Sequence, residues 1–557
     1  MRKNSIKTNL LALALTFTFI FPSFALAQTA TKAKSPARTA AENITAAQLK
    51  DYLYFVASDE MEGRDTPSRG LDATAKFIAT MLSRWGFKPA GDDGTYFQKM
   101  AMLRELPDAE NSKLTIGSQT LNYGEDYYRL SGSSENLISA PLVYGGSGWF
   151  VKSKGVDALQ NVDATGKIVV LYSDGVPNRA YATALPKNVA QADLPSAERG
   201  KDWVDPLTYA KQKGAVGVVV VASNAAQTDW KRLSTPSTNQ RPFVEKFRTE
   251  ISLPTVFVSQ KVGDMLFADA AKAPYKMTGD AQSNALTTLN TSQTISFRAA
   301  IKPERVFTQN VVAVWEGSDP TLKNEMVAIG AHYDHIGISQ NPQAPDKINN
   351  GADDDGSGTV AVLSMAEALA KSPKRPKRSI LLVWHCGEEK GLLGSLYFNR
   401  FPTVDIKNVV AQLNIDMIGR SRKAGDTNPQ NANLSGENDV FVIGSQMMSS
   451  KLGEITKSIN DTYLKLGYDY KYDDPKDTNR FFFRSDHFNY AVNGIPIVFW
   501  FDGVHEDYHR PGDEPQKIDY NKMQNVARTI FLTMWEVADL QTRPAVDKQL
   551  PPELTRR

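Results

Sequence analysis

The sequence comprises 557 residues, of which 41% are apolar and 23% are charged. This length and composition are typical of a soluble globular protein of two or three domains and exclude a disordered or fibrous chain. The formal net charge of +2 gives no indication of a nucleic-acid-binding surface, and the single cysteine, Cys386, excludes an internal disulfide framework.

The N-terminal residues 1–27 have the pattern of a secretory signal peptide. Three basic residues precede an apolar run at 10–24, and the sequence Ala-Leu-Ala at 25–27 is a cleavage signal. A membrane-anchoring helix is the alternative, but the run is short for a span. We therefore expect export to the periplasm or the cell exterior, with a mature start at Gln28 and no stable membrane insertion. Removing this segment lowers the Lys and Arg count from 64 to 61 against 62 acidic residues, a net charge of −1.

Two helices are predicted near the start of the mature chain. Residues 28–41 form a polar lead that we expect to be mobile. Helices follow at 45–57 and 71–85, where apolar residues recur at three- and four-residue steps and Gly86 can end the second helix. Residues 58–64 between them are predicted to form a polar loop.

From about residue 141 the sequence becomes rich in short β-strand signals. The predicted strands lie at 141–144, 166–172, 217–222 and 253–259, with one helix at 206–212. Glycines and prolines separate them. This region contains no histidine and is therefore a poor candidate for a metal site.

From residue 310 onward strand and helix signals alternate. Apolar runs predict strands at 311–315, 326–331, 379–384, 409–415 and 496–501, and a helix at 359–370. Alternation of this kind predicts an α/β fold, a three-layer α/β/α sandwich around a mixed, mostly parallel sheet. Functional groups in such sheets gather at the carboxyl ends of the strands.

All six histidines lie in this last region, at positions 332, 335, 385, 487, 505 and 509. His332 ends the predicted strand at 326–331, and Asp334 follows two positions later. A carboxylate beside a ligating histidine fixes its tautomer and increases its basicity. A structural, hydrogen-bonded histidine is the alternative for a single such residue.

Three adjacent acids, Asp353, Asp354 and Asp355, stand between glycines just before the helix at 359–370. A solvated turn that caps the helix is one interpretation. However, three neighbouring carboxylates repel one another unless a cation neutralises some of their charge. The loop can therefore supply the bridging carboxylate of a two-metal site.

Further acids follow the next two predicted strands. Glu388 and Glu389 come after 379–384, and Asp416 ends 409–415. Two adjacent acids at a strand end can divide the work: one binds metal while the other takes a proton from water. An exposed turn is the alternative for the glutamate pair. Late in the chain, His509 follows Tyr508.

Taken in order, these motifs resemble the M28 family of zinc exopeptidases. The motifs are His332-x-Asp334, Gly-Ala-Asp-Asp354-Asp-Gly-Ser-Gly, Glu388-Glu389-Lys-Gly-Leu-Leu-Gly-Ser, Asp416-Met and Tyr508-His509, and the resemblance extends to residues 57–64. The β-rich region resembles a protease-associated (PA) domain through Gly166-Lys-Ile-Val-Val, Tyr209-Ala-Lys-Gln-Lys-Gly-Ala-Val-Gly-Val and Leu253-Pro-Thr-Val.

The resemblance implies a role for each matched residue. His332 and Asp416 would hold one zinc ion, Glu389 and His509 a second, and Asp354 would bridge the two. Glu388 would be the general base, Asp334 would support His332, and Tyr508 would hydrogen-bond the developing oxyanion. The peptide bond between Asp354 and Asp355 is expected to be cis. The remaining histidines match no ligand and are expected to be structural or pocket-lining: His335, His385, His487 and His505.

The resemblance also implies the domain organisation and the activity. The peptidase domain would comprise residues 28–135 and 296–545, with a PA-like insert at 136–295 and a C-terminal tail at 546–557. The expected activity is removal of N-terminal residues from peptides with two zinc ions. Three alternatives stay open: a carboxypeptidase or dipeptidase of the same fold, for which Arg484 and Arg510 are the nearby cations, a single-zinc glutaminyl cyclase relative, and a non-catalytic binding protein.

Overall fold

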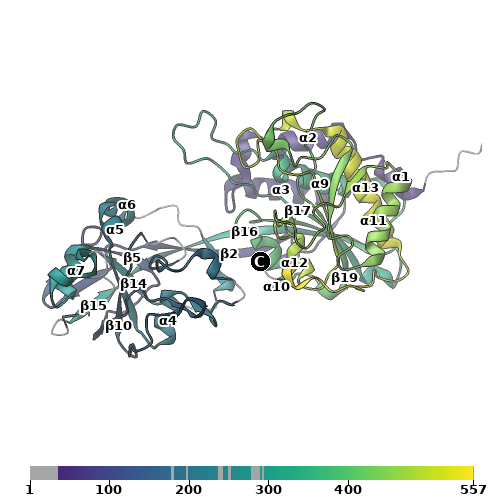
Figure 1. Cartoon of the computed structure of the whole chain (residues 1–557). Helices are drawn as coiled ribbons and strands as arrows, with labels where there is room; N and C mark the ends of the chain where they lie inside the picture. The colour runs from purple at the N-terminus through teal and green to yellow at the C-terminus, as the bar shows by residue number, and fades with distance from the viewer. Residues whose placement is uncertain are drawn as a thin grey trace, which may run out of the picture.

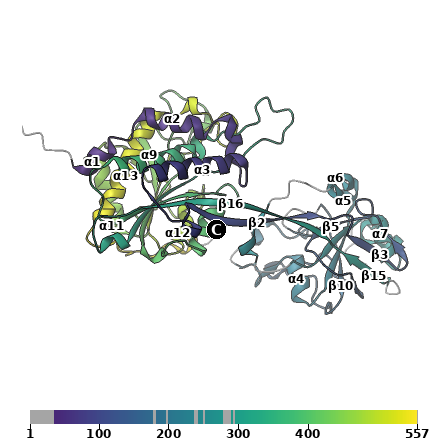
Figure 2. The same ribbon diagram turned by 180° about the vertical axis from the view of Figure 1, so that it is seen from behind.

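The computed structural model describes residues 35–555 except 177–180, 196–197, 236–241, 249–251, 278–288 and 291–293. The predicted signal peptide and the first residues of the predicted lead lie outside these ranges. Among the described helices, none combines the length and the apolar character needed to cross a bilayer. The chain forms two lobes, which Figures 1 and 2 show from opposite sides.

A ten-stranded mixed sheet forms the centre of the larger lobe. Its strands, in sheet order, are β13 (Phe243–Val244), β2 (Phe97–Pro107), β16 (Ile301–Trp315), β18 (Ser379–His385), β17 (Met326–His332), β19 (Val409–Ile415), β22 (Ile497–Phe501), β20 (Asp439–Ile443) and β21 (Gly467–Asp469), and β1 (Lys88–Pro89) pairs with β16. The four central strands, β18, β17, β19 and β22, are mutually parallel. Strand β16 joins β18 in antiparallel pairing, so the parallel part is confined to the centre and to β20 with β21.

Helices cover both faces of this sheet, which confirms the predicted α/β/α sandwich. One layer contains α1 (Pro36–Ala41), α2 (Ala46–Val56), α3 (Arg69–Arg84), α9 (Gly358–Lys371), α11 (Ser450–Thr462) and α13 (Tyr520–Asp539). The opposite layer contains α10 (Leu393–Arg400) and α12 (His487–Ala491). Because both faces are covered, every residue of β17, β18 and β19 is buried, as continuous apolar runs predict.

Three local expectations need correction. The predicted mobile lead is helical from Pro36, where the Ser35 side chain caps α1 and Ala40 and Ala41 are buried. The predicted polar loop at 58–64 is a 3₁₀ turn (Asp59–Arg64) with its last residue buried. The strand predicted at 311–315 is only the final third of β16, because six of its first ten residues are polar and this part gains its strand conformation from pairing with β2.

The strands β2 and β16 pair as a long antiparallel ribbon that connects the two lobes. Beyond it, the smaller lobe contains a five-stranded sheet in the order β5 (Tyr127–Ser131), β14 (Thr255–Val258), β12 (Gly217–Val221), β10 (Ile168–Tyr172) and β7 (Leu142–Tyr144). Its helices are α4 (Pro206–Gln212), α5 (Asn224–Thr228), α6 (Trp230–Ser234) and α7 (Gln260–Leu266). Two small sheets complete it: β4 (Gln119–Thr120), β3 (Lys113–Ile116), β15 (Ile295–Arg298) and β6 (Ile138–Ala140) in one, and β11 (Trp203–Val204), β8 (Phe150–Val151) and β9 (Val156–Asp157) in the other.

One segment of the smaller lobe returns to the larger one. Strand β13 pairs with β2 at the edge of the large sheet. Just after it, the Phe247 ring lies 6.0 Å from that of Tyr397 and 6.3 Å from that of Phe401, at the end of α10. The lobes are therefore joined by this contact as well as by the ribbon.

Candidate metal centre

The candidate site lies where the parallel strands of the large sheet end. Strand β17 ends at His332, β18 is followed by Glu388 and Glu389, and β19 by Asp416. The loop after β22 carries His509. Parallel strands place their carboxyl ends at one edge of a sheet, so side chains separated by up to 177 positions meet there.

The first group of side chains surrounds His332. Its Nε2 lies 3.3 Å from Oδ1 of Asp354, 3.5 Å from Oδ1 of Asp416 and 4.0 Å from Oε2 of Glu388. Its Nδ1 lies 3.1 Å from the main-chain oxygen of Asp334. Donation from Nδ1 to this oxygen leaves the Nε2 lone pair directed at the carboxylates, the tautomer that a metal ligand needs.

The second group surrounds His509. Its Nε2 lies 3.1 Å from Oδ2 of Asp354 and 3.1 Å from Oε2 of Glu389. The Nδ1 of His335 lies 2.8 Å from Oε1 of Glu389 and 3.7 Å from Oδ2 of Asp354. His335, which the sequence predicts to be structural or pocket-lining, therefore faces this group.

The carboxylate of Asp354 is common to both groups. One of its oxygens faces His332 and the other faces His509. The predicted cis peptide bond between Asp354 and Asp355 is present. Asp355 lies near the first group as well, but its oxygens accept main-chain N–H groups of Gly358 and Met417, at 2.8 and 3.2 Å, and of His332, at 3.2 Å. Asp355 thus holds the loop, while Asp354 presents both oxygens to the site.

These side chains fit a pair of zinc ions. Two ligand atoms that each lie about 2.1 Å from one tetrahedral zinc ion stand roughly 3.4 Å apart, close to the separations from His332 and His509 to their carboxylates, 3.1 to 3.5 Å. Several atoms of the cluster are buried without a hydrogen-bond partner, among them Oδ2 of Asp354, Oε1 of Glu389 and Nε2 of His509. Buried polar atoms of this kind need a compensating ligand.

The two adjacent glutamates have opposite electrostatic environments. Burial raises the pKa of Glu388 well above its ordinary value, and the charges of Glu389 and Asp416 add to this effect although His332 opposes it. Burial also acts on Glu389, but contacts with His335 and His509 bring its pKa below the ordinary value. One glutamate therefore favours holding a proton while its neighbour stays ionised, a division typical of acid and base roles.

The carboxylate of Asp354, the predicted bridging residue, is strongly anionic. Burial opposes ionisation of Asp354, yet the nearby His332, His335 and His509 hold its pKa well below its ordinary value. In turn, burial disfavours the charged form of His332, but the carboxylates around it raise its pKa well above the ordinary value. The carboxylates of this cluster thus attract positive charge, which protons or metal ions can supply.

Asp334 supports the site in a different way from the one expected. The Nδ1 of His332 lies nearer its main-chain oxygen, at 3.1 Å, than its carboxylate, at 3.7 Å. The carboxylate instead accepts the main-chain N–H of Glu388 and the hydroxyl of Thr66, both at 3.1 Å. The same hydroxyl accepts the main-chain N–H of Gly387 at 3.0 Å. Asp334 therefore ties the glutamate loop to β17.

Arg64 is a buried residue of the site that the sequence interpretation missed. Its guanidinium donates to the main-chain oxygens of Tyr333 at 2.9 Å, Asn350 at 2.7 Å, Gly351 at 2.9 Å and Val56 at 2.8 Å. It therefore joins α2 to the loops that carry His332 and Asp354. The only signal in the sequence was the resemblance of residues 57–64 to the family, because a single arginine in a polar segment predicts no burial.

Tyr508 and Arg484 close one side of the site. The Tyr508 ring stacks on His509 with centroids 3.9 Å apart, and burial raises the pKa of Tyr508, so its hydroxyl keeps its proton. Arg484 Nη2 donates to this hydroxyl at 3.3 Å. Both residues line a narrow cavity together with Asp354, Glu388, Asp416, Met417, Phe481, Phe499, Phe501 and Val504. The cavity combines the metal-centre acids with an apolar wall.

The other histidines lie outside both groups. Burial lowers the pKa of His385 and of His487 to about 3, so both stay neutral. His385 Nε2 lies 3.2 Å from the hydroxyl of Tyr490, and His487 stacks on Phe499 at 4.5 Å. His505 Nε2 lies 3.4 Å from Oδ2 of Asp353, behind the bridging loop.

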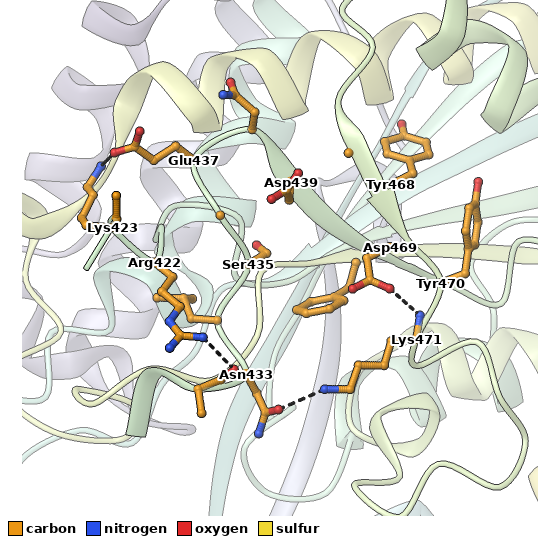
Figure 3. Close-up of a pocket in the computed structure, with 17 residues that line it drawn as sticks. Arg422, Lys423, Asn433, Ser435, Glu437, Asp439, Tyr468, Asp469, Tyr470 and Lys471 are labelled. Atoms are coloured by element: carbon orange, nitrogen blue, oxygen red, sulfur yellow. Dashed lines mark hydrogen bonds and ion pairs between the residues drawn. The ribbon is translucent and has the colours of Figure 1, made fainter. Parts of the chain in front are cut away.

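A separate and more open cavity of about 880 Å³ lies beside β20 and β21 (Figure 3). Several of its polar side chains contact one another. Lys423 contacts Glu437 at 2.8 Å and Lys471 donates to Asn433 at 3.1 Å. It contains none of the residues of the two histidine groups and is not the candidate site.

Parts of this chain are similar in sequence to known proteins. Residues 310–534 match the family described as Peptidase family M28, and residues 138–266 match the PA domain. A "Probable leucine aminopeptidase" of Trichophyton verrucosum is 30% identical over 229 residues, which are 39% of this chain and 56% of that protein. A "Probable zinc metalloprotease" of Pyrenophora teres f. teres is 26% identical over 301 residues, 47% of this chain and 58% of that protein.

Among solved structures, an "Aminopeptidase from Aneurinibacillus sp. strain AM-1" is 16% identical, with a TM-score of 0.46. That alignment covers 93% of this chain and 98% of the other. The chain spans about half the length of the curated relatives that it matches. The matches of residues 310–534 and 138–266 agree with the motifs identified in the sequence.

Proposed function

We propose that the protein is an exported zinc aminopeptidase of peptidase family M28, because residues 310–534 match that family and residues 138–266 match the PA domain. It hydrolyses the first peptide bond of peptides with two zinc ions, a bridging aspartate and a glutamate base. The observation that carries the proposal is the carboxylate of Asp354, whose two oxygens face two separate histidine groups beside Glu388.

The proposed ligands divide between the two histidine groups. His332 and Asp416 would hold one zinc ion, Glu389 and His509 would hold the other, and both would share the carboxylate of Asp354. His335 stands close enough to Glu389, at 2.8 Å, to orient it. When bound, the two zinc ions would polarise the scissile carbonyl and lower the pKa of a shared water.

Glu388 is the proposed proton carrier. Its carboxylate takes a proton from the attacking water and later delivers it to the leaving amine. The raised pKa of Glu388 favours holding that proton between the two events. The hydrogen bond from its main-chain N–H to Asp334 fixes the base at the end of β18. The Tyr508 hydroxyl, which keeps its proton, would donate to the oxyanion of the substrate carbonyl.

The site suits a substrate with a free α-amino group. Glu388, which is not a proposed zinc ligand, lines the cavity beside Asp354 and Asp416, so a free amine can rest against a metal or this carboxylate, whereas a blocked N-terminus cannot. The site would therefore select chain ends over chain middles.

The experiment uses the mature protein, starting at Gln28, with its zinc content measured. Free-amine peptides should lose their first residue, N-acetylated forms of the same peptides should not, and chelation should abolish release until zinc is restored. Equal cleavage of blocked and free peptides, or full activity after zinc removal, would refute the proposal. N-terminal sequencing of the exported protein tests cleavage after Ala27.

A further inference from the structure

We propose that Arg484 is a binding site for a carboxylate of the substrate, so that the preferred peptides carry a carboxylate close to the scissile bond. Two kinds of peptide meet this condition: dipeptides with a free C-terminus, and peptides whose first residue is Asp or Glu. The inference rests on the proposed peptidase function and specifies the substrate class of the same site.

The first observation is the position of Arg484. It lines the cavity that also contains Asp354, Glu388 and Asp416. Its guanidinium carbon lies 4.9 Å from the ring centroid of Phe481 and 5.9 Å from that of Tyr508. A cation is therefore held by aromatic rings beside the groups proposed to act on the scissile bond.

The second observation is that this cation lacks an acidic partner. In the described part of the chain, Arg484 forms no ion pair, and its hydrogen bond goes to the Tyr508 hydroxyl. Two buried arginines of the same lobe are paired, Arg420 with Asp507 at 2.9 Å and Arg378 with Glu325 at 2.8 Å. The remaining N–H groups of Arg484 are thus available to a ligand.

The chemistry of the site identifies that ligand as a carboxylate. A guanidinium presents parallel N–H donors that match two carboxylate oxygens. Asp354 and Asp416 in the cavity lining are proposed zinc ligands, which leaves Glu388 to repel an anionic substrate, and Arg484 offsets that repulsion. Arg484 is itself exposed to solvent, so a substrate carboxylate can reach its guanidinium.

Arg510, the other cation suggested by the sequence, does not line this cavity. It is exposed, and its main-chain N–H donates to the main-chain oxygen of Asp507. It therefore serves as a matched control for Arg484.

The test compares two substrate pairs on the zinc-loaded mature protein. In each pair only the carboxylate differs: Ala-Ala against Ala-alaninamide, and Glu-p-nitroanilide against Gln-p-nitroanilide. The wild type should prefer the carboxylate member of one pair by about tenfold in kcat/KM, chiefly through KM. R484Q should remove most of that preference, R484K should retain part of it, and R510Q should match the wild type.

The pair that shows the preference identifies the source of the carboxylate. No preference in either pair, or an equal preference in R484Q, would overturn the inference. An equal fall of kcat for all four substrates in R484Q would also overturn it, because it would mean that Arg484 acts only by orienting the Tyr508 hydroxyl. Absence of hydrolysis of any substrate by the zinc-loaded wild type would instead overturn the proposed function itself.

Discussion

The two lobes both contain a sheet with buried parallel strands, but they bury different kinds of side chain. The five-stranded sheet of the smaller lobe is filled by Val, Ile, Leu, Phe and Tyr, and its buried ions have partners, such as Asp205 with Arg199 at 3.0 Å. The sheet of the larger lobe ends in a cluster of buried carboxylates and histidines that contact one another at 2.8 to 4.0 Å, and several of their polar atoms form no hydrogen bond within the described residues. Burying such groups is unfavourable unless a ligand compensates them. We infer that the sheet edge of the larger lobe needs a bound ligand to offset the burial of its charged groups. The core of the smaller lobe needs only apolar packing and paired charges.

The largest expected effect is a loss of turnover in the larger lobe without a loss of bound zinc. Glu388→Gln should lower kcat roughly a thousandfold or more, because the amide cannot carry the proton. Zinc content and melting temperature should stay at wild-type values, as metal analysis and calorimetry would show. Glu437→Gln, the same change at an exposed residue paired with Lys423, is the control and should leave kcat unchanged. Near-normal turnover of Glu388→Gln with full zinc occupancy would remove Glu388 from the mechanism.

An Asp→Asn substitution in each lobe tests whether buried acids bind zinc in the larger lobe and only stabilise the fold in the smaller one. Asp354→Asn should reduce the zinc stoichiometry of the purified protein from two per chain to one or fewer, because both groups lose their shared ligand. Asp205→Asn should lower the melting temperature, since it removes the charge that pairs with Arg199, and should leave zinc content unchanged. Two zinc ions retained in Asp354→Asn would contradict the bridge.

Two buried arginines of the larger lobe offer a sharper comparison. Arg64→Lys leaves several main-chain oxygens of the metal-bearing loops unsatisfied, so zinc affinity should fall by about tenfold. Arg378→Lys loosens the contacts with Glu325 and Leu540, far from the site, and should lower only the melting temperature. Competition with a zinc-binding dye measures the affinities. Equal zinc affinity in the two variants would show that Arg64 has no specific role at the metal centre.

The smallest expected effect concerns a half-buried acid of the larger lobe that lies outside the site, Asp473. Burial raises the pKa of Asp473 to about 6 despite hydrogen bonds from the main-chain N–H groups of Gly444 and Gln446. A raised carboxyl pKa favours the folded state below about pH 4, and this contribution is lost as the pH rises through 6. Asp473→Asn should therefore be more stable than the wild type at pH 7.5, by about 1 kcal/mol or roughly 2 °C. The difference should shrink at pH 5 in thermal melts; a pH-independent difference would refute the assignment.

Much of the fold followed from local patterns. Apolar periodicity predicted α2, α3 and α9 within two residues of their ends, and continuous apolar runs predicted β17, β18, β19 and β22. The ribbon of β2 and β16 was not predicted in full, because its polar residues become strand only through pairing across about 200 positions. This ribbon connects the smaller lobe to the larger one.

The sequence by itself determined the class of fold and the residue types available to a metal centre, because buried strands and their polar ends are encoded locally. Five residues predicted as ligands lie together in the structure, although their role stays a prediction. Only the tertiary structure decided that His335 faces Glu389, that Asp334 supports His332 through its main-chain oxygen, and that Arg64 joins the two loops. Such contacts depend on the packing of distant segments at one sheet edge, which no local pattern specifies.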